Sequence, residues 1–172
     1  MKKLGLDEIS TSRMSKPRGN KLRSYEAFFR VAKELSHDIC VNSNNEIVDG
    51  YCSYLIAKKY NYDGYRIHVM KSDTPVKVVR CRYYRIKDKD VKLGEKEYSF
   101  VYALKSSVCP GDIVKVKQND TYSSLVVTAI ECFEPCDTQN ITGRIAKTTP
   151  YMLVKNTLDE RVMVTWKTNR YI

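Results

Sequence analysis

The sequence predicts an α+β protein with an α/β unit over residues 1–74 and a β-rich, mainly antiparallel unit over residues 75–172. Three observations predict this division. Apolar residues recur at helical spacing in two segments before residue 75, short β-branched runs dominate after it, and residues 72–75 are typical of a junction. Pro75 disfavours regular structure across that junction. A chain of 172 residues fits one domain or two small ones.

The formal net charge of +10 at pH 7 is the strongest compositional feature. A basic surface attracts polyanions, so nucleic acid or a nucleoprotein is the expected partner, with solubility or an acidic protein partner as alternatives. The sequence has no apolar run of about 18 residues and no signal-peptide core, so neither membrane insertion nor secretion is expected. Six cysteines without a repeated close pair favour reduced thiols and a cytoplasmic location.

Residues 1–24 are expected to form a flexible basic arm, because Pro17 and Gly19 interrupt helical structure. Such an arm could reach phosphates, and a solvated loop with scattered charge is an equally good interpretation. Its candidate nucleic-acid-binding residues are Arg13, Lys16, Arg18, Lys21 and Arg23. Residues 25–35 follow as a helix with one apolar face, which is typical of a core helix. The residues of that face are Tyr25, Phe28, Phe29, Ala32 and Leu35.

A strand, a tight turn and a helix are expected between residues 45 and 60. Ile47 and Val48 suit a buried strand, and Asp49-Gly50 is a strong turn signal because Gly tolerates positive φ. The start of the helix leaves free backbone N–H groups near Gly50 and Tyr51, which could hold an anion. An ordinary strand-to-helix turn is the alternative. Strands over residues 39–41 and 65–70 are expected to flank this segment.

The run Asp49-Gly50-Tyr51-Cys52-Ser53-Tyr54, the helix after it and Tyr65-Arg66-Ile67-His68-Val69 resemble the N-terminal domain of the ParB/sulfiredoxin superfamily. An upstream segment, residues 9–18, is similar to the early strand and Pro-Arg element of that family. The resemblance covers roughly residues 4–70 and implies a ParB-like α/β domain. Ser53 replaces the Arg that contacts nucleotide phosphate in the family, and Tyr51 stands where sulfiredoxins have their catalytic Cys. Nucleotide hydrolysis and sulfinic-acid repair are therefore not expected.

The β-rich unit is expected to carry cations and aromatic rings along its first strand, residues 76–86. Arg80 and Arg82 share one face with Tyr84, an arrangement that suits a single-stranded nucleic-acid groove or an edge strand protected by charge. The candidate binding residues of this unit are Arg80, Arg82, Arg85, Lys115 and Lys117. Residues 88–97 are expected to be a charged connection centred on Gly94. Further strands are expected at 98–104, 113–116, 125–130, 141–146, 151–155 and 161–166, with Trp166 packed inside.

The succession Pro110-Gly111-Asp112, Val-x-Val, turn and Leu-Val-Val is similar to small β-barrel modules of nucleic-acid-processing proteins. A small, mainly antiparallel β-barrel is therefore the expected architecture of residues 75–172.

The chain lacks a Walker loop, a GxSxG elbow and an HExxH motif. Asp49 and Glu46 are the only suggestive acidic pair, and they could hold a divalent metal that activates water for phosphodiester cleavage. Three positions apart on a strand, however, they are expected to face different ways. His37 and His68 have no partner at a fixed spacing, so structural or surface roles are favoured over metal ligation. Buried free thiols are likewise favoured over a zinc site at Cys132 and Cys136.

We therefore expect a cytoplasmic protein that binds nucleic acid or a nucleoprotein through basic surfaces on both units. Small basic proteins that pair such units are similar to products of phages and mobile elements, including anti-CRISPR proteins that inhibit RNA-guided effectors. Two alternatives stay open. One is a ParB-like nuclease centred on Asp49 and Glu46, which alone would need a divalent metal cofactor. The other is an inhibitor that contacts only protein, its basic face complementing an acidic patch on the target.

Overall fold

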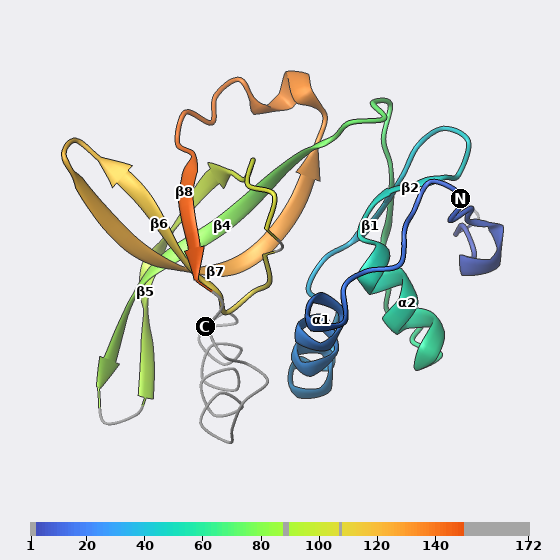
Figure 1. Cartoon of the computed structure of the whole chain (residues 1–172), viewed down its shortest axis with the longest axis horizontal. Coiled ribbons are helices and arrows are strands. Elements are labelled where there is room, and N and C mark those ends of the chain that lie inside the picture. Colours follow the sequence, from blue (N-terminus) through green and yellow to red (C-terminus); the bar gives the residue numbers. More distant parts are fainter. Residues whose placement is uncertain (1–2, 88–89, 107, 150–172) are drawn as a thin grey trace.

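The computed structural model describes residues 3–87, 90–106 and 108–149. Two units lie side by side in Figure 1. The first contains the 3-10 helix η1 (Leu6–Glu8), the helices α1 (Gly19–Ala32) and α2 (Tyr51–Lys59), and the strands β1 (Ile39–Val41), β2 (Ile47–Asp49) and β3 (Ile67–Val69). The second contains β4 (Val76–Lys87), β5 (Asp90–Val101), β6 (Ile113–Gln118), β7 (Thr121–Phe133), the 3-10 helix η2 (Pro135–Thr138) and β8 (Ile145–Thr149). The expected α+β class is confirmed.

The first unit is organised around a three-stranded sheet with the strand order β2-β1-β3. β1 and β2 form an antiparallel hairpin, and β3 pairs with β1 in parallel after the chain has passed through α2. Ile39, Val41 and Ile47 are fully buried in this sheet and pack against Tyr54 of α2. Short apolar, β-branched runs predicted β1 and β2 correctly, and alternation over residues 65–70 predicted β3.

Residues 3–24 do not form the expected free basic arm. Ile9 is buried against the first sheet, with Leu4, Leu6 and Met14 packed beside it. Ser10 forms a parallel bridge with Glu46, its N–H donating to Asn45 O. Helix α1 then begins at Gly19, six positions before the expected start, because an interrupting Pro17 lies outside the helix and leaves residues 19–24 free to continue it. The apolar residues spaced along this arm attach it to the fold.

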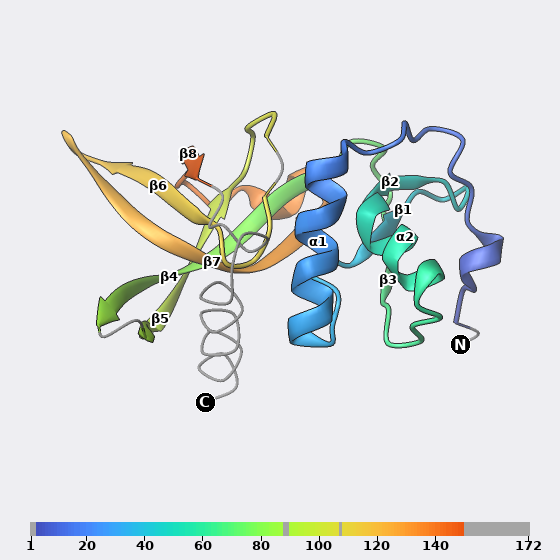
Figure 2. The same cartoon turned by 60° about the horizontal axis from the view of Figure 1, so that its bottom comes forward.

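Helix α1 belongs to the first unit and lies on the side that faces the second unit, as Figure 2 shows. Its Tyr25 and Phe29 pack against Cys52 and Ile56 of α2. Phe28, fully buried on another side of the helix, packs with Cys109 of the second unit. The first sheet ends with β3 and the second begins with β4, whereas the apolar contacts of α1 reach both units.

The second unit is one antiparallel sheet with the strand order β5-β4-β7-β6-β8. Val79, Val114, Leu125 and Val127 form the centre of its core. Its two outer strands approach each other only at an isolated bridge between Val101 and Arg144, where Val101 N–H donates to Gly143 O. One bridge does not make a ladder between β5 and β8, so the described strands form no closed barrel.

The charged connection expected over residues 88–97 is wrong, because residues 90–97 belong to strand β5. The strand starts at Asp90 and pairs with β4 along nearly its whole length. Gly94 lies where the register shifts between Arg82 and Tyr84, so the irregularity is a bulge inside a hairpin and not its end. Charged residues are compatible with a strand here because β5 is an edge strand.

The remaining expectations concern the C-terminal residues and the membrane. The strands expected at 151–155 and 161–166, and Trp166, lie outside the described residues. Among the described helices, none is both long and apolar enough to cross a bilayer.

Candidate functional site

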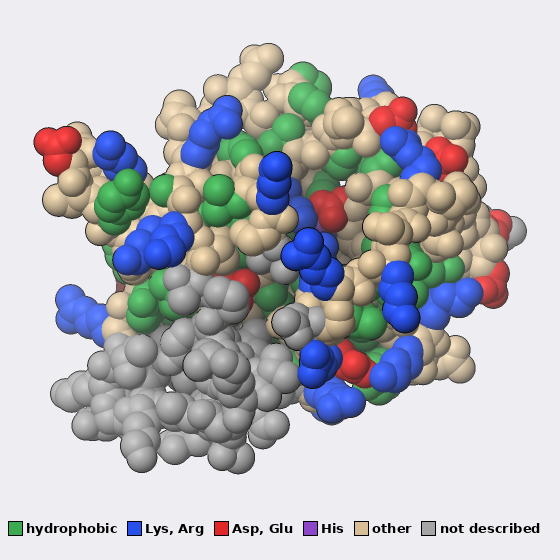
Figure 3. All heavy atoms as spheres, viewed as in Figure 1, with side chains coloured by type: hydrophobic (Ala, Val, Ile, Leu, Met, Phe, Trp, Pro, Cys, Tyr) green, Lys and Arg blue, Asp and Glu red, His purple; other side chains and the backbone are tan. Residues whose placement is uncertain are grey.

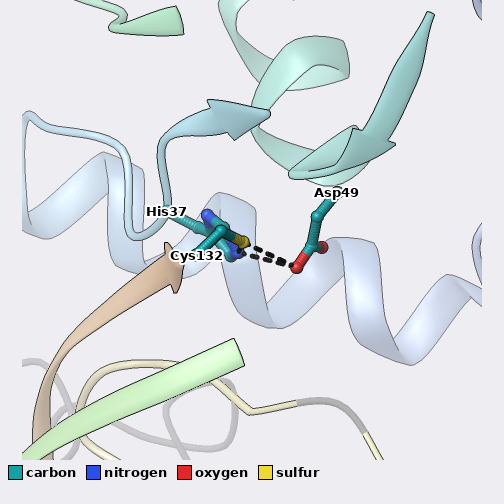
Figure 4. Close-up of side chains that lie close together, drawn as sticks. All are labelled: His37, Asp49 and Cys132. Carbon is teal, nitrogen blue, oxygen red and sulfur yellow. Dashed lines mark hydrogen bonds and ion pairs between the residues drawn. The ribbon is translucent and has the colours of Figure 1, made fainter. Parts of the chain in front are cut away.

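A polar cluster lies at the junction of the two units, where His37, Asp49 and Cys132 point toward one another (Figure 4). His37 Nε2 lies 3.2 Å from Asp49 Oδ2 and 3.7 Å from Cys132 Sγ. The thiol of Cys132 donates to the same Asp49 oxygen at 3.1 Å. Lys77 approaches that oxygen as well, with its Nζ 3.5 Å away. We call these four residues the junction cluster.

Strand register brings the junction cluster together. Lys77 on β4 and Cys132 on β7 are direct cross-strand partners, so their side chains share one face. Asp49 on β2 is in the same way the partner of Cys40 on β1. His37 forms a parallel bridge with Ile130, which ties the segment before β1 to β7. Each residue is therefore placed by backbone pairing, and the cluster is built equally from both units.

In the junction cluster, burial and neighbouring charges shift the pKa values of His37 and Asp49 in opposite directions. Burial favours a neutral imidazole, but the Asp49 carboxylate outweighs it and raises the pKa of His37 to about 9. Burial also opposes ionisation of Asp49, yet His37 and Lys77 hold the pKa of its carboxyl well below the usual range. A hydrogen bond with Cys40, together with burial, raises the pKa of the Cys132 thiol. The ground state is therefore an imidazolium, a carboxylate and a thiol.

This arrangement does not form a nucleophile–His–carboxylate triad. In such a triad one ring nitrogen serves the nucleophile and the other serves the carboxylate. Here Nε2 of His37 faces both Cys132 and Asp49, and Nδ1 is buried without a hydrogen-bond partner among the described residues. A thiol with a raised pKa is also a weak nucleophile. The three convergent atoms instead form a donor set that a metal ion could use.

A pocket of about 480 Å³ opens beside the junction cluster. Asp49 and Lys77 contribute to its wall, together with Tyr102 and the exposed Arg144. The other lining residues are Pro75, Val76, Val101, Ala103, Leu104, Thr138 and Ile141. The Asp49 side chain is 24% exposed, so solvent reaches it beside the pocket.

Glu46 and Asp49 lie in separate hydrogen-bond networks, as their spacing on the strand predicted. Glu46 accepts from Asn42 Nδ2 at 2.7 Å and lies 3.9 Å from Arg13 Nη1. Arg13 also pairs with Asp73 at 3.0 Å, which ties the N-terminal segment to the connection between β3 and β4. Asp49 instead contacts His37 and Lys77 within the junction cluster. The described contacts therefore do not unite the two carboxylates in one metal centre.

The Gly50 turn has the expected conformation but not the expected open amide. Gly50 has φ +81°, and its N–H donates to Asp49 Oδ1 at 2.7 Å. The residue is buried against the backbone of Asp38 and Ile39. Tyr51 stacks on Tyr54 and packs into the first core. The structure thus leaves no free Gly50 amide for an external anion.

The basic residues singled out in the sequence fall into two groups. Arg13, Arg80 and Arg82 form ion pairs within the protein, the two latter with Glu97. Arg80 also pairs with Glu131 at 3.1 Å. Arg23 makes further contacts within the protein. The remaining candidates form no ion pair with another described residue; they are Lys16, Arg18, Lys21, Arg85, Lys115 and Lys117. Lysines and arginines extend over both units on the face in Figure 3.

Strand pairing gathers several of these cations on the outer face of the five-stranded sheet. Val114 and Val116 of β6 point into the core, so Lys115 and Lys117 point outward. Lys115 lies directly opposite Lys147 of β8, a residue that the sequence reasoning missed. Lys117 lies opposite Tyr122, whose side chain is 59% exposed. We call these four residues the β6–β8 basic face.

Comparison of the chain with protein-family models, with curated proteins and with solved structures finds no match. The site is therefore interpreted from its own geometry.

Proposed function

We propose that this protein binds nucleic acid through the β6–β8 basic face, and that single strands are preferred over duplexes. The observation that carries the proposal is the direct cross-strand pairing of Lys115 with Lys147. Like charges opposite each other destabilise a sheet. Neither lysine forms an ion pair with another described residue. Phosphate groups of a bound strand would supply the missing negative charge.

An exposed aromatic ring beside these cations supports the single-stranded form. Tyr122 lies opposite Lys117 at the end of the β6–β7 hairpin and is 59% exposed. Proteins that bind single strands combine a cationic surface for the backbone with aromatic rings on which unpaired bases stack. Bases within a duplex are already stacked and do not offer their faces. Tyr122 therefore favours a single strand as the ligand.

Arg80 and Arg82 are expected to contribute less to nucleic-acid affinity than the lysines of the β6–β8 basic face. They lie on the same outer face, since Arg82 is the cross-strand partner of Val126, two residues from Ser124, which pairs with Lys115. Their charges are compensated by Glu97 and Glu131. A phosphate would have to compete with these carboxylates, so we assign most of the affinity to the uncompensated lysines.

The proposal also includes a ParB-like first unit, a barrel-like second unit and an action in the cytoplasm. A ParB-like first unit is supported by the order of β2, the Gly50 turn, α2 and β3. A barrel-like second unit is supported by the bridge between Val101 and Arg144, which brings the two ends of the sheet together. The net charge of +10 suits an action on nucleic acid in the cytoplasm, including the nucleic acid of an RNA-guided effector.

Fluorescence anisotropy with labelled single-stranded RNA, single-stranded DNA and duplexes tests the proposal. We expect affinity to fall as salt rises, because each neutralised phosphate releases counterions. A triple variant Lys115→Gln, Lys117→Gln, Lys147→Gln is expected to bind weakly. Its slope of log affinity against log salt should be shallower by about 2, given about 0.7 for each phosphate contact on a single strand.

The matched control removes three exposed cations from the first unit, as Lys33→Gln, Lys58→Gln and Arg66→Gln. It changes the net charge equally but leaves the β6–β8 basic face intact, so it should keep nearly the whole affinity and slope. Equal losses in both triple variants would contradict a localised site. Absence of binding by the wild-type protein at about 50 mM salt would contradict the function itself. Tyr122→Ala should weaken single-strand binding more than duplex binding.

A further inference from the structure

The geometry points to a metal site of the zinc type in which His37 Nε2, Asp49 Oδ2 and Cys132 Sγ are the protein ligands. From the sequence, a structural or surface role was expected for His37 and a buried free thiol at Cys132, and Asp49 was expected in the turn at Gly50 or in an acidic pair with Glu46. The site is independent of the proposed nucleic-acid surface, because it lies at the junction of the units and uses none of the lysines of the β6–β8 basic face.

The three donor atoms are spaced as ligands of one small ion. Their separations are 3.2 Å for nitrogen to oxygen, 3.1 Å for sulfur to oxygen and 3.7 Å for nitrogen to sulfur. In tetrahedral zinc sites, bonds of about 2.0–2.1 Å to nitrogen and oxygen and about 2.3 Å to sulfur separate ligand atoms by about 3.3–3.6 Å. An ion can therefore enter the triangle with shifts of a few tenths of an ångström in the side chains.

The donor types select the class of metal. A thiolate, an imidazole and a carboxylate together suit a borderline ion such as Zn²⁺ or Co²⁺. Mg²⁺ and Ca²⁺ prefer sets made of oxygen ligands. Three protein ligands leave a fourth position for water. The pocket beside Asp49 gives both an entry path and room for that water.

Fixed backbone pairing holds the ligands in place before any metal binds. The His37 side chain is only 1% exposed, and the His37–Ile130 bridge fixes its backbone. Cys132 and Asp49 are held by the β4–β7 and β1–β2 ladders. Little side-chain freedom is lost on binding, so the site is preorganised. Because the ligands come from both units, a bound ion would also clamp the first sheet to the second.

A metal must displace the Lys77 ammonium group from Asp49, and it must also displace the proton on His37 Nε2 and the thiol proton of Cys132, both of which pass to water. Lys77 Nζ lies 3.5 Å from the Asp49 oxygen that would bind the ion. In the metal-free protein Lys77 compensates the Asp49 charge, and in the metal-bound protein two cations would compete for one carboxylate. Lys77 also lines the pocket, so its flexible chain can move the ammonium group into that space. Lys77→Met is therefore expected to tighten metal binding.

The experiment is a titration of the reduced, metal-free full-length chain with Co²⁺, followed by displacement with Zn²⁺. We expect one equivalent to bind, with a thiolate-to-cobalt charge-transfer band and the visible spectrum of a four-coordinate ion. Cys132→Ser should abolish the charge-transfer band. His37→Gln and Asp49→Asn should weaken binding by more than about 100-fold, beyond what loss of an outer-shell partner costs. Circular dichroism checks that each variant is folded.

Two matched controls use the same residue types outside the triangle. Cys136→Ser removes an exposed thiol four positions from Cys132, and His68→Gln removes an exposed histidine that contacts Asp38. Both should keep the band and the affinity. A band that survives Cys132→Ser, or that disappears in Cys136→Ser, would overturn the assignment, as would the absence of any cobalt band in the wild-type chain.

Alkylation of the wild-type protein gives a test that needs no folded variant. Because the Cys132 thiol is a weak nucleophile, the reaction with iodoacetamide is continued until Cys132 is fully modified in the metal-free protein. Equimolar Zn²⁺ should then protect Cys132 over the same time, while exposed Cys136 should react equally with and without the ion. Peptide mass spectrometry distinguishes the two thiols. Equal modification of Cys132 in both conditions would contradict the site.

Discussion

His37 Nε2 and Cys132 Sγ lie 3.7 Å apart, although 95 positions separate the two residues in the chain. The contact exists because the segment before β1 bridges to Ile130, two residues before Cys132 on β7. Asp49 completes the arrangement from the end of β2. A histidine expected in a structural or surface role, a turn aspartate and a free thiol thus become one group only when the two units meet.

Replacement of Lys147, which lies opposite Lys115, should change stability and nucleic-acid affinity in opposite directions. Lys147→Glu replaces a like-charge pair with an opposite-charge pair across β6 and β8, so the free energy of unfolding should rise by about 0.5–1 kcal/mol. High salt should reduce the gain. Urea unfolding measures it, and nucleic-acid affinity of the same variant should fall. Lys117→Glu is the control, because its cross-strand partner is Tyr122; an equal gain there would contradict the explanation.

Gly50 should be among the least replaceable residues of the first unit. Its φ of +81° disfavours any side chain, and an added Cβ would lie 2.3 Å from Asp38 O and 2.9 Å from Ile39 Cα. Gly50→Ala should lower the free energy of unfolding by roughly 3–5 kcal/mol, from backbone strain and overpacking together.

Gly19→Ala is the matched control for that variant. At the start of α1 an added Cβ would meet only the flexible end of Arg23, 3.9 Å away. The change should be neutral or stabilise by about 0.5 kcal/mol, because it restricts the unfolded chain. Thermal unfolding compares the two variants, and similar losses would show that the tight contact at Gly50 does not decide its role.

Tyr25 should contribute to the attachment of α1 to the second unit. Its buried hydroxyl donates to Val108 O at 2.9 Å. Tyr25→Phe keeps the ring but leaves a buried carbonyl without this donor, which should cost about 1–3 kcal/mol. Chemical unfolding measures the loss. Tyr122→Phe removes an exposed hydroxyl and should stay within about 0.5 kcal/mol of the wild type; if both changes cost the same, the inferred hydrogen bond contributes nothing.

The ion pair between α1 and α2 should make stability depend on pH in the acidic range. Hydrogen bonds from Lys59 and Tyr60 lower the pKa of the Glu26 carboxyl below its ordinary value. A lowered folded-state pKa contributes stability above the unfolded-state pKa, and this contribution is lost as pH falls through the folded-state value. Glu26→Gln should therefore be less stable than the wild type at pH 7, by up to about 1 kcal/mol, and equally stable in strong acid.

Urea unfolding of both proteins from pH 7 to about pH 2 measures this convergence. Glu95→Gln is the control, since Glu95 is exposed on β5 and forms no ion pair with another described residue. It should track the wild type at every pH. A difference between Glu26→Gln and the wild type that persists in strong acid would show that the variant acts through packing.

Local patterns predicted the parts of the fold that depend on a few neighbouring residues. The Asp49-Gly50 turn and the apolar pair Ile47-Val48 specify β2 and the start of α2. The same reasoning placed the start of α1 too late and treated residues 88–97 as a connection. Packing of Leu22 beside Tyr25 and Phe29, and pairing of β5 with the preceding strand β4, stabilise residues whose own composition favours a loop.

The sequence by itself determined the α+β class, the strand faces and the excess of positive charge, because these follow from alternation and composition over short spans. Tertiary structure alone decided which charges are compensated and which donor atoms converge. Glu97 neutralises Arg80 and Arg82, whereas Lys147 leaves Lys115 facing a like charge. Those relationships, like the meeting of His37, Asp49 and Cys132, depend on strand register between remote segments, which spacing along the chain does not encode.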